Sequence, residues 1–211
     1  MSLSPSAKSL KKISYWIENS TSEHAEVIRG EYALRLAGTP IEANDYTPQP
    51  GLEREILKLY AEEIDFKLSE EILELYEWYN GNFIVGDVSN PVYFVTFEET
   101  FLHYADKARA FPIFIGDELY YFVEEATRDM NTSPIYALNG VDFFSYKTSF
   151  IVNYAPSITS YMQAMAECIE VYDEISIKCS RYSSQWLKYR PLFSQIYEKY
   201  GVNTEGNVIW C

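Results

Sequence analysis

The clearest pattern of apolar and polar positions lies in the segment 68–82, which reads LSEEILELYEWYNGN. Its apolar side chains recur at three- and four-residue steps, and its glutamates fall on the opposite side of a helix. The apolar positions are Ile72, Leu75, Tyr76 and Tyr79, and the glutamates of the wet side are Glu70, Glu74 and Glu77. The segment therefore predicts a complete short helix whose apolar side belongs to the core.

The ends of this helix carry their own signals. The hydroxyl of Ser69 can accept a hydrogen bond from a free backbone N–H of the first turn. Leu68 and Leu73 have the spacing of a hydrophobic staple around that cap. Gly81 follows as the residue that most easily adopts the left-handed conformation that ends a helix. The pattern thus predicts a start at Ser69 and a stop at Gly81.

Helical spacing recurs in other parts of the chain. Thr96 and Glu99 have the spacing of a capping box, and Pro156 with Ser157 predicts the start of a late helix. The remaining helices are expected over about 7–18, 22–36, 52–64, 97–108 and 157–172, with one more on each side of Pro191. Proline-rich 39–50 predicts a linker, and 83–90 predicts a loop punctuated by glycine.

Short segments rich in aromatic and β-branched residues predict strands. They cover about 92–95, 111–115, 119–123, 135–138, 143–146 and 150–153. Most are separated by short spacers, which favour antiparallel hairpins over parallel crossovers. The predicted helices come first, the strands follow, and a helix comes after them. This segregated order is typical of an α+β fold rather than of a wound parallel sheet. We expect a central antiparallel sheet of about four to six short strands, flanked by helices, with added terminal helices.

These elements divide the chain into three regions. Residues 1–49 form an N-terminal helical extension and linker, 50–175 the α+β domain, and 176–211 a C-terminal extension. Residues 1–175 hold 12 Lys or Arg and 29 Asp or Glu, a balance of −17, whereas 176–211 hold 5 and 2, a balance of +3. The basic extension either folds back on the acidic body or forms a separate docking arm, and its apolar content favours folding back.

Composition narrows the class of protein. The chain has 211 residues and a net charge of −14, which argues against binding to nucleic acid or to anionic membranes. No run approaches the roughly 18 apolar residues of a membrane span, and the start of the chain lacks a secretory signal, so a cytoplasmic location is expected. Cys168, Cys179 and Cys211 show no C-x-x-C spacing, which supports neither a disulfide framework nor a structural zinc site. We expect no metal and no cofactor.

Sequence patterns of catalysis are missing. His24 and His103 are the only histidines, and each falls in a predicted amphipathic helix without a metal-binding spacing. There is no G-x-S-x-G, no phosphate-binding loop and no dinucleotide-binding glycine pattern. Paired carboxylates are abundant, but 31 acidic residues make chance pairs inevitable. The chain is therefore expected not to be an enzyme.

Aromatic residues supply the candidate site. The chain has 19 tyrosines and 12 phenylalanines, and neighbouring pairs such as Tyr120-Tyr121 and Trp78-Tyr79 cannot both point inward from a regular element. Exposed rings beside acidic residues suit recognition of a basic protein surface. The candidate partner-binding residues are Trp78, Asp117, Glu118, Tyr120, Tyr121 and Glu124. The alternatives are that the terminal extensions cover these rings and that 116–118 is an ordinary solvated hairpin turn.

The order of motifs resembles the SUKH superfamily of Smi/Knr-like domains. The similar pieces are PGLEREILKLY, LSEEILELYEWYNG, FPIFIGDELYYF, SPIYAL and APSITSYMQAMAECIE, which follow one another over about 50–172. The chain departs from the usual pattern at Leu68-Ser69, where Leu-Pro is common, and at Phe111, where Trp is common. The resemblance implies an α+β protein-binding module. Many bacterial members are thought to be immunity proteins that neutralise secreted toxins, often nucleases or deaminases, and the family brings no catalytic residues.

These observations give one leading hypothesis and two alternatives. The first is a non-enzymatic protein-binding domain, an immunity protein whose acidic surface attracts and occludes a basic toxin. The second is a regulatory or scaffold protein, and the remote third is a hydrolase or transferase with a carboxylate dyad. A deep cleft lined by converging carboxylates would favour the enzyme, whereas a shallow acidic groove with exposed rings would favour binding.

Overall fold

The computed structural model describes residues 3–29, 35–36, 39–40, 48–85, 92–104, 109–116, 119–126, 131–139, 152–176 and 188–204. Its first half contains α1 (Pro5–Asn19), α2 (Glu23–Ile28), β1 (Arg35–Leu36), β2 (Thr39–Pro40), α3 (Arg54–Glu63), α4 (Glu70–Trp78), β3 (Phe83–Val85), β4 (Val92–Phe94) and α5 (Phe97–His103). The second half contains β5 (Ala110–Gly116), β6 (Leu119–Glu124), β7 (Ile135–Asn139), β8 (Val152–Ala155), α7 (Ile158–Ser176) and α8 (Arg190–Lys199).

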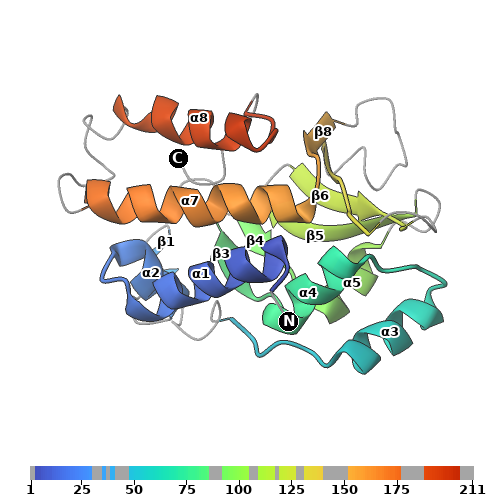
Figure 1. Ribbon diagram of the computed structural model, residues 1–211. Coiled ribbons are helices and arrows are strands. Elements are labelled where there is room, and N and C mark those ends of the chain that lie inside the picture. Colours follow the sequence, from blue (N-terminus) through green and yellow to red (C-terminus); the bar gives the residue numbers. More distant parts are fainter. Residues whose placement is uncertain are drawn as a thin grey trace.

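The strands form an antiparallel meander of six in the order β3-β4-β5-β6-β7-β8, and β1 pairs separately with β2. Every neighbouring pair in the larger sheet is antiparallel. In Figure 1, α7 runs in front of this sheet and lies between α8 and α1. The predicted α+β class, with a central antiparallel sheet and added terminal helices, is confirmed.

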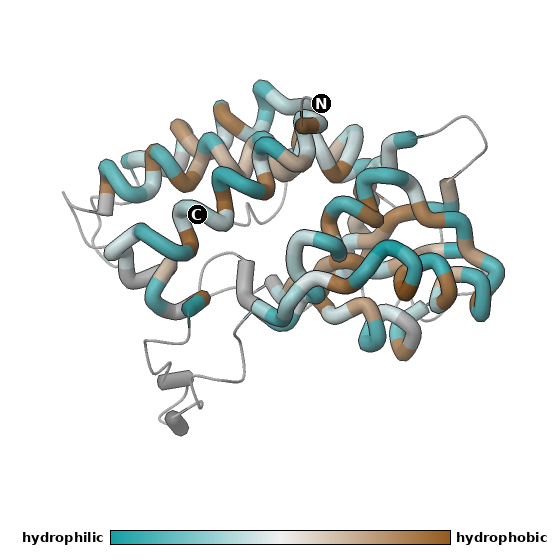
Figure 2. The backbone as a smooth tube through the Cα atoms, turned by 60° about the horizontal axis from the view of Figure 1, so that its bottom comes forward, coloured by the Kyte–Doolittle hydropathy of each residue, from teal (hydrophilic) through white to brown (hydrophobic). Residues whose placement is uncertain are grey.

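One hydrophobic core joins the described regions. It contains Ile13 of α1, Tyr76 of α4, Phe114 of β5, Met165 of α7 and Phe193 of α8, all at most 1% exposed. Along the helices, apolar and polar stretches alternate, as expected where one side of each helix is buried (Figure 2). The described parts of all three regions proposed from the sequence therefore share the same core.

Four predicted elements differ from the structure. The predicted helix 22–36 ends at Ile28, and Arg35 and Leu36 form β1 instead. The predicted linker 39–50 begins with β2, which pairs with β1. The predicted loop 83–90 opens with β3, whose residues pair with β4. Helix α5 ends at His103 rather than near residue 108. The predicted strand 143–146 lies outside the described residues.

The buried carboxylate of Glu71 joins three segments that are distant in sequence. Its Oε2 accepts hydrogen bonds from the backbone N–H of Ser133 at 2.7 Å and of Ile158 at 3.2 Å, and its Oε1 accepts one from Thr159 at 3.1 Å. Ile158 and Thr159 begin α7, so a carboxylate of α4 satisfies N–H groups at the start of α7. Beside it, Ser69 caps α4 through Ile72, as predicted, and its hydroxyl lies 2.5 Å from that of Ser133.

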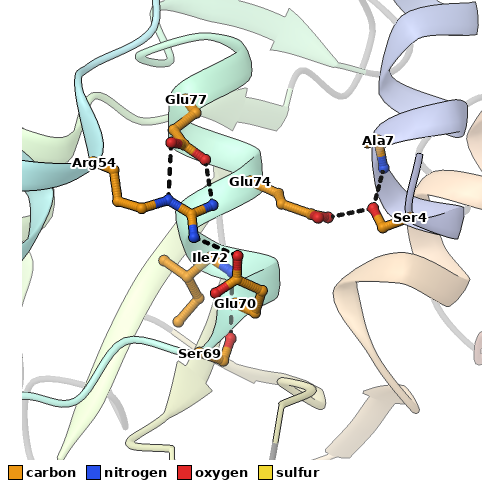
Figure 3. A network of polar contacts seen from close by, with 8 residues as sticks. All are labelled: Ser4, Ala7, Arg54, Ser69, Glu70, Ile72, Glu74 and Glu77. Atoms are coloured by element: carbon orange, nitrogen blue, oxygen red, sulfur yellow. Dashed lines mark hydrogen bonds and ion pairs between the residues drawn. The ribbon is translucent and has the colours of Figure 1, made fainter. Parts of the chain in front are cut away.

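The polar side of α4 holds α3 and α1 (Figure 3). The guanidinium of Arg54 forms a bidentate pair with Glu77 at 2.9 and 2.6 Å and reaches Glu70 at 2.5 Å. The hydrogen bond with Glu77 is the largest cause that raises the pKa of Arg54. On the same side, Ser4 caps α1 and donates its hydroxyl to Glu74 at 2.9 Å. The glutamates predicted to be wet therefore also position two neighbouring helices.

The run Tyr79-Asn80-Gly81 has a structural role that differs from the predicted helix stop. Helix α4 ends at Trp78, and Tyr79 is already extended with φ −142°. Gly81, with φ +63°, is required because a Cβ there would lie 2.3 Å from the carbonyl of Val95. Asn80 accepts a hydrogen bond from the backbone N–H of Phe97 at 2.7 Å, at the start of α5. The run thus connects the end of α4 to α5.

Residues 188–204 of the basic C-terminal segment pack on the rest of the domain. Phe193 and Tyr197 of α8 are fully buried in the main core. Lys199 pairs with Glu167 of α7 at 2.6 Å, and Tyr200 donates its hydroxyl to the same carboxylate at 2.7 Å. The ammonium group of Lys199 lowers the pKa of Glu167. Residues 188–204 therefore pack against α7 through both buried rings and charged contacts.

Replacing Glu71 by alanine is expected to lower the free energy of unfolding by about 3 kcal/mol, because buried N–H groups lose a charged acceptor. Urea denaturation measures the change. The control is Glu63→Ala, an exposed glutamate of α3, which should cost less than about 0.5 kcal/mol. Equal losses in the two variants would contradict the assigned role of Glu71.

Replacing Gly51 by alanine is expected to destabilise the protein by about 2 kcal/mol or more, because backbone cannot yield to the added methyl group. The new Cβ would lie 1.9 Å from the carbonyl oxygen of Glu77. Gly201→Ala is the matched control. Its Cβ would meet only the Pro156 side chain at 3.3 Å. The free energy of unfolding of that variant should fall by about 1 kcal/mol, mainly because alanine is strained in a left-handed backbone conformation. In thermal unfolding, the midpoint temperature of Gly51→Ala should be lower than that of Gly201→Ala.

Candidate functional site

The structure separates the predicted partner-binding residues. Tyr121 is 2% exposed, and its ring packs against Tyr154 with centroids 4.8 Å apart. Trp78 is half-buried and donates its indole N–H to Ser14 of α1 at 2.6 Å. Tyr121 is therefore a core residue, and Trp78 holds α4 against α1. The prediction that Tyr121 lies on a contact surface is wrong. For Trp78, the structure shows a contact that joins two helices.

Other predicted residues remain on a surface. Tyr120 is half-buried and Glu124 is exposed. Both belong to β6, and they point to the opposite side of the sheet from Tyr121 because side chains alternate along a strand. Asp117 and Glu118 lie outside the described residues. The prediction that Tyr120 and Tyr121 cannot both point inward is confirmed.

The sheet has two faces of different character. Its inner face, which includes Phe94, Phe114 and Tyr121, belongs to the main core with α1, α4 and α7. On the outer face, Ala110, Phe122 and Leu138 form a separate small cluster, against which Tyr120 and Tyr136 pack. The outer face is therefore lined by aromatic side chains that are not part of the main core.

Strand register places the outer residues in rows. Tyr93, Ile115, Tyr120 and Leu138 are successive partners across β4 to β7. In the next row, Phe122 is the partner of Tyr136, and the two rings stack at 5.8 Å. Partners directly across a sheet point to the same side and lie close enough to pack. The result is a strip of aromatic and aliphatic side chains across the sheet.

Charge and partial burial distinguish this strip. Desolvation raises the pKa of Tyr120 and of Tyr136, and the negative charge of Glu124 raises that of Tyr136 further. A carboxylate thus acts on a half-buried phenol on the outer face. We call Tyr93, Glu99, Tyr120, Glu124 and Tyr136 the outer-face patch.

A groove of about 490 Å³ opens at one end of this patch. We call it the α5 groove, and it is lined by Asn82, Tyr93, Phe94, Val95, Glu99, His103 and Ile115. Glu99 and His103 are one turn apart on α5, so they share one side of the helix. The ring of His103 lies 5.7 Å from that of Tyr120, and its Nδ1 lies 3.4 Å from the Tyr120 hydroxyl. The groove therefore adjoins the predicted residue Tyr120.

The carboxylate of Glu99 is held by the capping box predicted from the sequence. Its Oε2 accepts hydrogen bonds from the backbone N–H of Thr96 at 3.1 Å and from the Thr96 hydroxyl at 3.2 Å. In return, Thr96 Oγ1 accepts the backbone N–H of Glu99 at 3.1 Å. The reciprocal contacts fix the orientation of a negative charge at the wall of the groove.

Sequence reasoning missed Tyr93, Glu99 and His103. His103 was interpreted as a histidine of a helix face, and Glu99 only as a cap. The i, i+4 spacing of Glu99 and His103 was the available signal, since it places both on one side of α5. The contact of His103 with Tyr120 depends on how α5 is placed against β6, which no local pattern reveals.

A second groove, of about 530 Å³, lies among α1, α7 and α8. Its lining includes Lys12, Glu167, Glu170 and Tyr200. Lys12 pairs with Glu170 at 2.5 Å, and Lys199 at the same place pairs with Glu167 at 2.6 Å. These charged groups join the helices to one another, so we assign this groove to the packing of the fold.

In the part of the chain that the structure describes, no three His, Cys, Asp or Glu side chains gather closely enough to hold a metal ion. None of the described helices has the length and apolar character needed to cross a membrane.

No protein-family model, curated protein or solved structure matches this chain. Its fold is that of an α+β protein, and the outer face of its antiparallel sheet carries half-buried tyrosines accompanied by Glu99 and Glu124.

Tyrosines 120 and 121 should respond differently to truncation. Tyr121→Ala is expected to cost about 3 kcal/mol or more, because it empties a buried site, whereas half-buried Tyr120→Ala should cost about 1 kcal/mol. Urea denaturation of both variants measures the difference. Equal destabilisation would contradict the assignment of Tyr120 to the outer face and Tyr121 to the core.

Proposed function

We propose that this protein is a non-enzymatic binding protein that holds a basic protein partner against its outer-face patch. The observation that carries the proposal is the position of Tyr93, Tyr120 and Tyr136, half-buried on the sheet face outside the main core and accompanied by Glu99 and Glu124. Tyrosine supplies rigid contact area with a polar end, which makes it a frequent anchor of protein interfaces.

Electrostatics supports a basic partner. The net charge of −14 attracts a positively charged protein over long distances and speeds its encounter. Carboxylates within the outer-face patch would then select a partner that presents Lys or Arg at the contact. Such a complex occludes the partner's own positive surface, which for a nucleic-acid-acting protein is its working surface.

The proposed biological role is that of an immunity protein that neutralises a secreted toxin in the cytoplasm. The SUKH resemblance of residues 50–172 supports this role, and the antiparallel α+β fold is compatible with it. A regulatory or scaffold protein would use the same patch for a different basic partner. Among the described residues that line the α5 groove, Glu99 is the single carboxylate and lies beside rings, an arrangement that favours binding over a carboxylate-dyad hydrolase.

The proposal is tested by retaining partners from the native cell on the immobilised protein. We expect a basic protein to be retained and its own activity to be blocked. The double variant Tyr120→Ala, Tyr136→Ala should retain it at least about tenfold less well, because two interface anchors are lost. Retention by the unaltered protein should also fall as salt rises from about 0.05 M to about 0.5 M.

The matched control is Tyr15→Ala, which removes a tyrosine of α1 that is 68% exposed and lies away from the sheet. This variant should retain the partner like the unaltered protein. A retained partner that is not basic, or an equal loss in the Tyr15→Ala control, would contradict the proposed function.

A further inference from the structure

We propose that the α5 groove receives an arginine side chain of the partner protein. This inference rests on the proposed function and specifies the chemical group that the partner presents. Three features of the groove carry it: a carboxylate held in a fixed orientation, aromatic walls, and a rigid backbone rim. Each is present in the described residues before any partner binds.

The carboxylate is Glu99. The capping box uses only its Oε2, and none of its contacts in the described structure involves Oε1. A carboxylate oxygen at the wall of a groove, with its side chain already immobilised, loses little conformational entropy when a cation binds. A guanidinium can donate to that oxygen through a short, charge-assisted hydrogen bond.

The walls favour a planar cation over a compact one. Tyr93 and His103 line the groove, and Tyr120 stands next to His103. Guanidinium groups are planar and weakly hydrated, so they stack on aromatic rings, whereas the lysine ammonium keeps a strongly held water shell. Ile115 and Val95 add apolar surface suited to the methylene stem of an arginine.

The rim is held by backbone geometry. Asn82 has φ +63°, a left-handed conformation that asparagine tolerates, and its N–H donates to the carbonyl of Phe94 at 2.8 Å. The N–H of Val95 donates to the carbonyl of Ile113 at 3.2 Å. These bonds fix β4 and the turn before β3 around the groove. The site therefore exists without rearrangement, which strengthens the binding of a small group.

The probe is acetyl-arginine methylamide, titrated into isotopically labelled full-length protein and followed by two-dimensional NMR. Shifts should be confined to the α5 groove and its neighbour Tyr120. The neutral isostere acetyl-citrulline methylamide should bind at least about tenfold more weakly, because it lacks the charge that Glu99 recognises. This comparison uses the unaltered protein, so it does not depend on the folding of a variant.

A pair of variants isolates the carboxylate. Glu99→Gln keeps a side-chain oxygen for the capping box but removes the charge, and it should weaken arginine binding at least about fivefold. Glu62→Gln, which removes an exposed charge from α3, should leave binding within about twofold.

Three results would overturn the inference: equal binding of arginine and citrulline probes, equal weakening by the two variants, or shifts scattered over the surface. The proposed function is judged separately by partner retention. Retention that depends on Tyr120 and Tyr136 without arginine-probe binding would leave the proposed function standing and remove the groove from it. Arginine-probe binding without patch-dependent retention would contradict the proposed function and leave the α5 groove as an arginine-binding site.

Discussion

The buried carboxylate of Glu71 is the constraint on which the arrangement of the molecule depends. A charge that is 5% exposed is tolerated only when hydrogen bonds replace its water, and here backbone N–H groups of Ser133, Ile158 and Thr159 supply them. The same bonds satisfy N–H groups at the start of α7 that the helix itself leaves without partners. One side chain of α4 therefore fixes both the start of α7 and the approach to β7.

This anchoring determines which side of the sheet is filled. With α7 held at its first turn, its apolar residues such as Tyr161 and Met165 pack on the inner face, and α1 and α8 pack against α7. The outer face keeps its aromatic residues outside the main core, in a separate small cluster. The proposed contact surface is thus a consequence of how the core is closed, and Tyr120 lies on it because its neighbour Tyr121 lies in the core.

Local chemistry made much of the fold predictable. The cap at Ser69, the capping box of Thr96 and Glu99 and the start of α7 are where the sequence indicates, because each depends on residues within a few positions of one another. Errors arose where pairing overruled local pattern. Residues 35–36 form a strand pair instead of continuing a helix. Glycine is needed at position 81 because of the nearby backbone of Val95 and not because α4 ends there.

The sequence by itself determined the α+β class, the antiparallel pairing of the central sheet and the acidic character of the chain, since these follow from periodicity, spacer length and charge. It also determined that one of Tyr120 and Tyr121 must face away from the core. Only the tertiary structure decided which one does, and only it brought Tyr120 of β6 beside His103 of α5. The physical reason is that such contacts depend on strand register and helix placement, which arise from packing between segments distant in the chain.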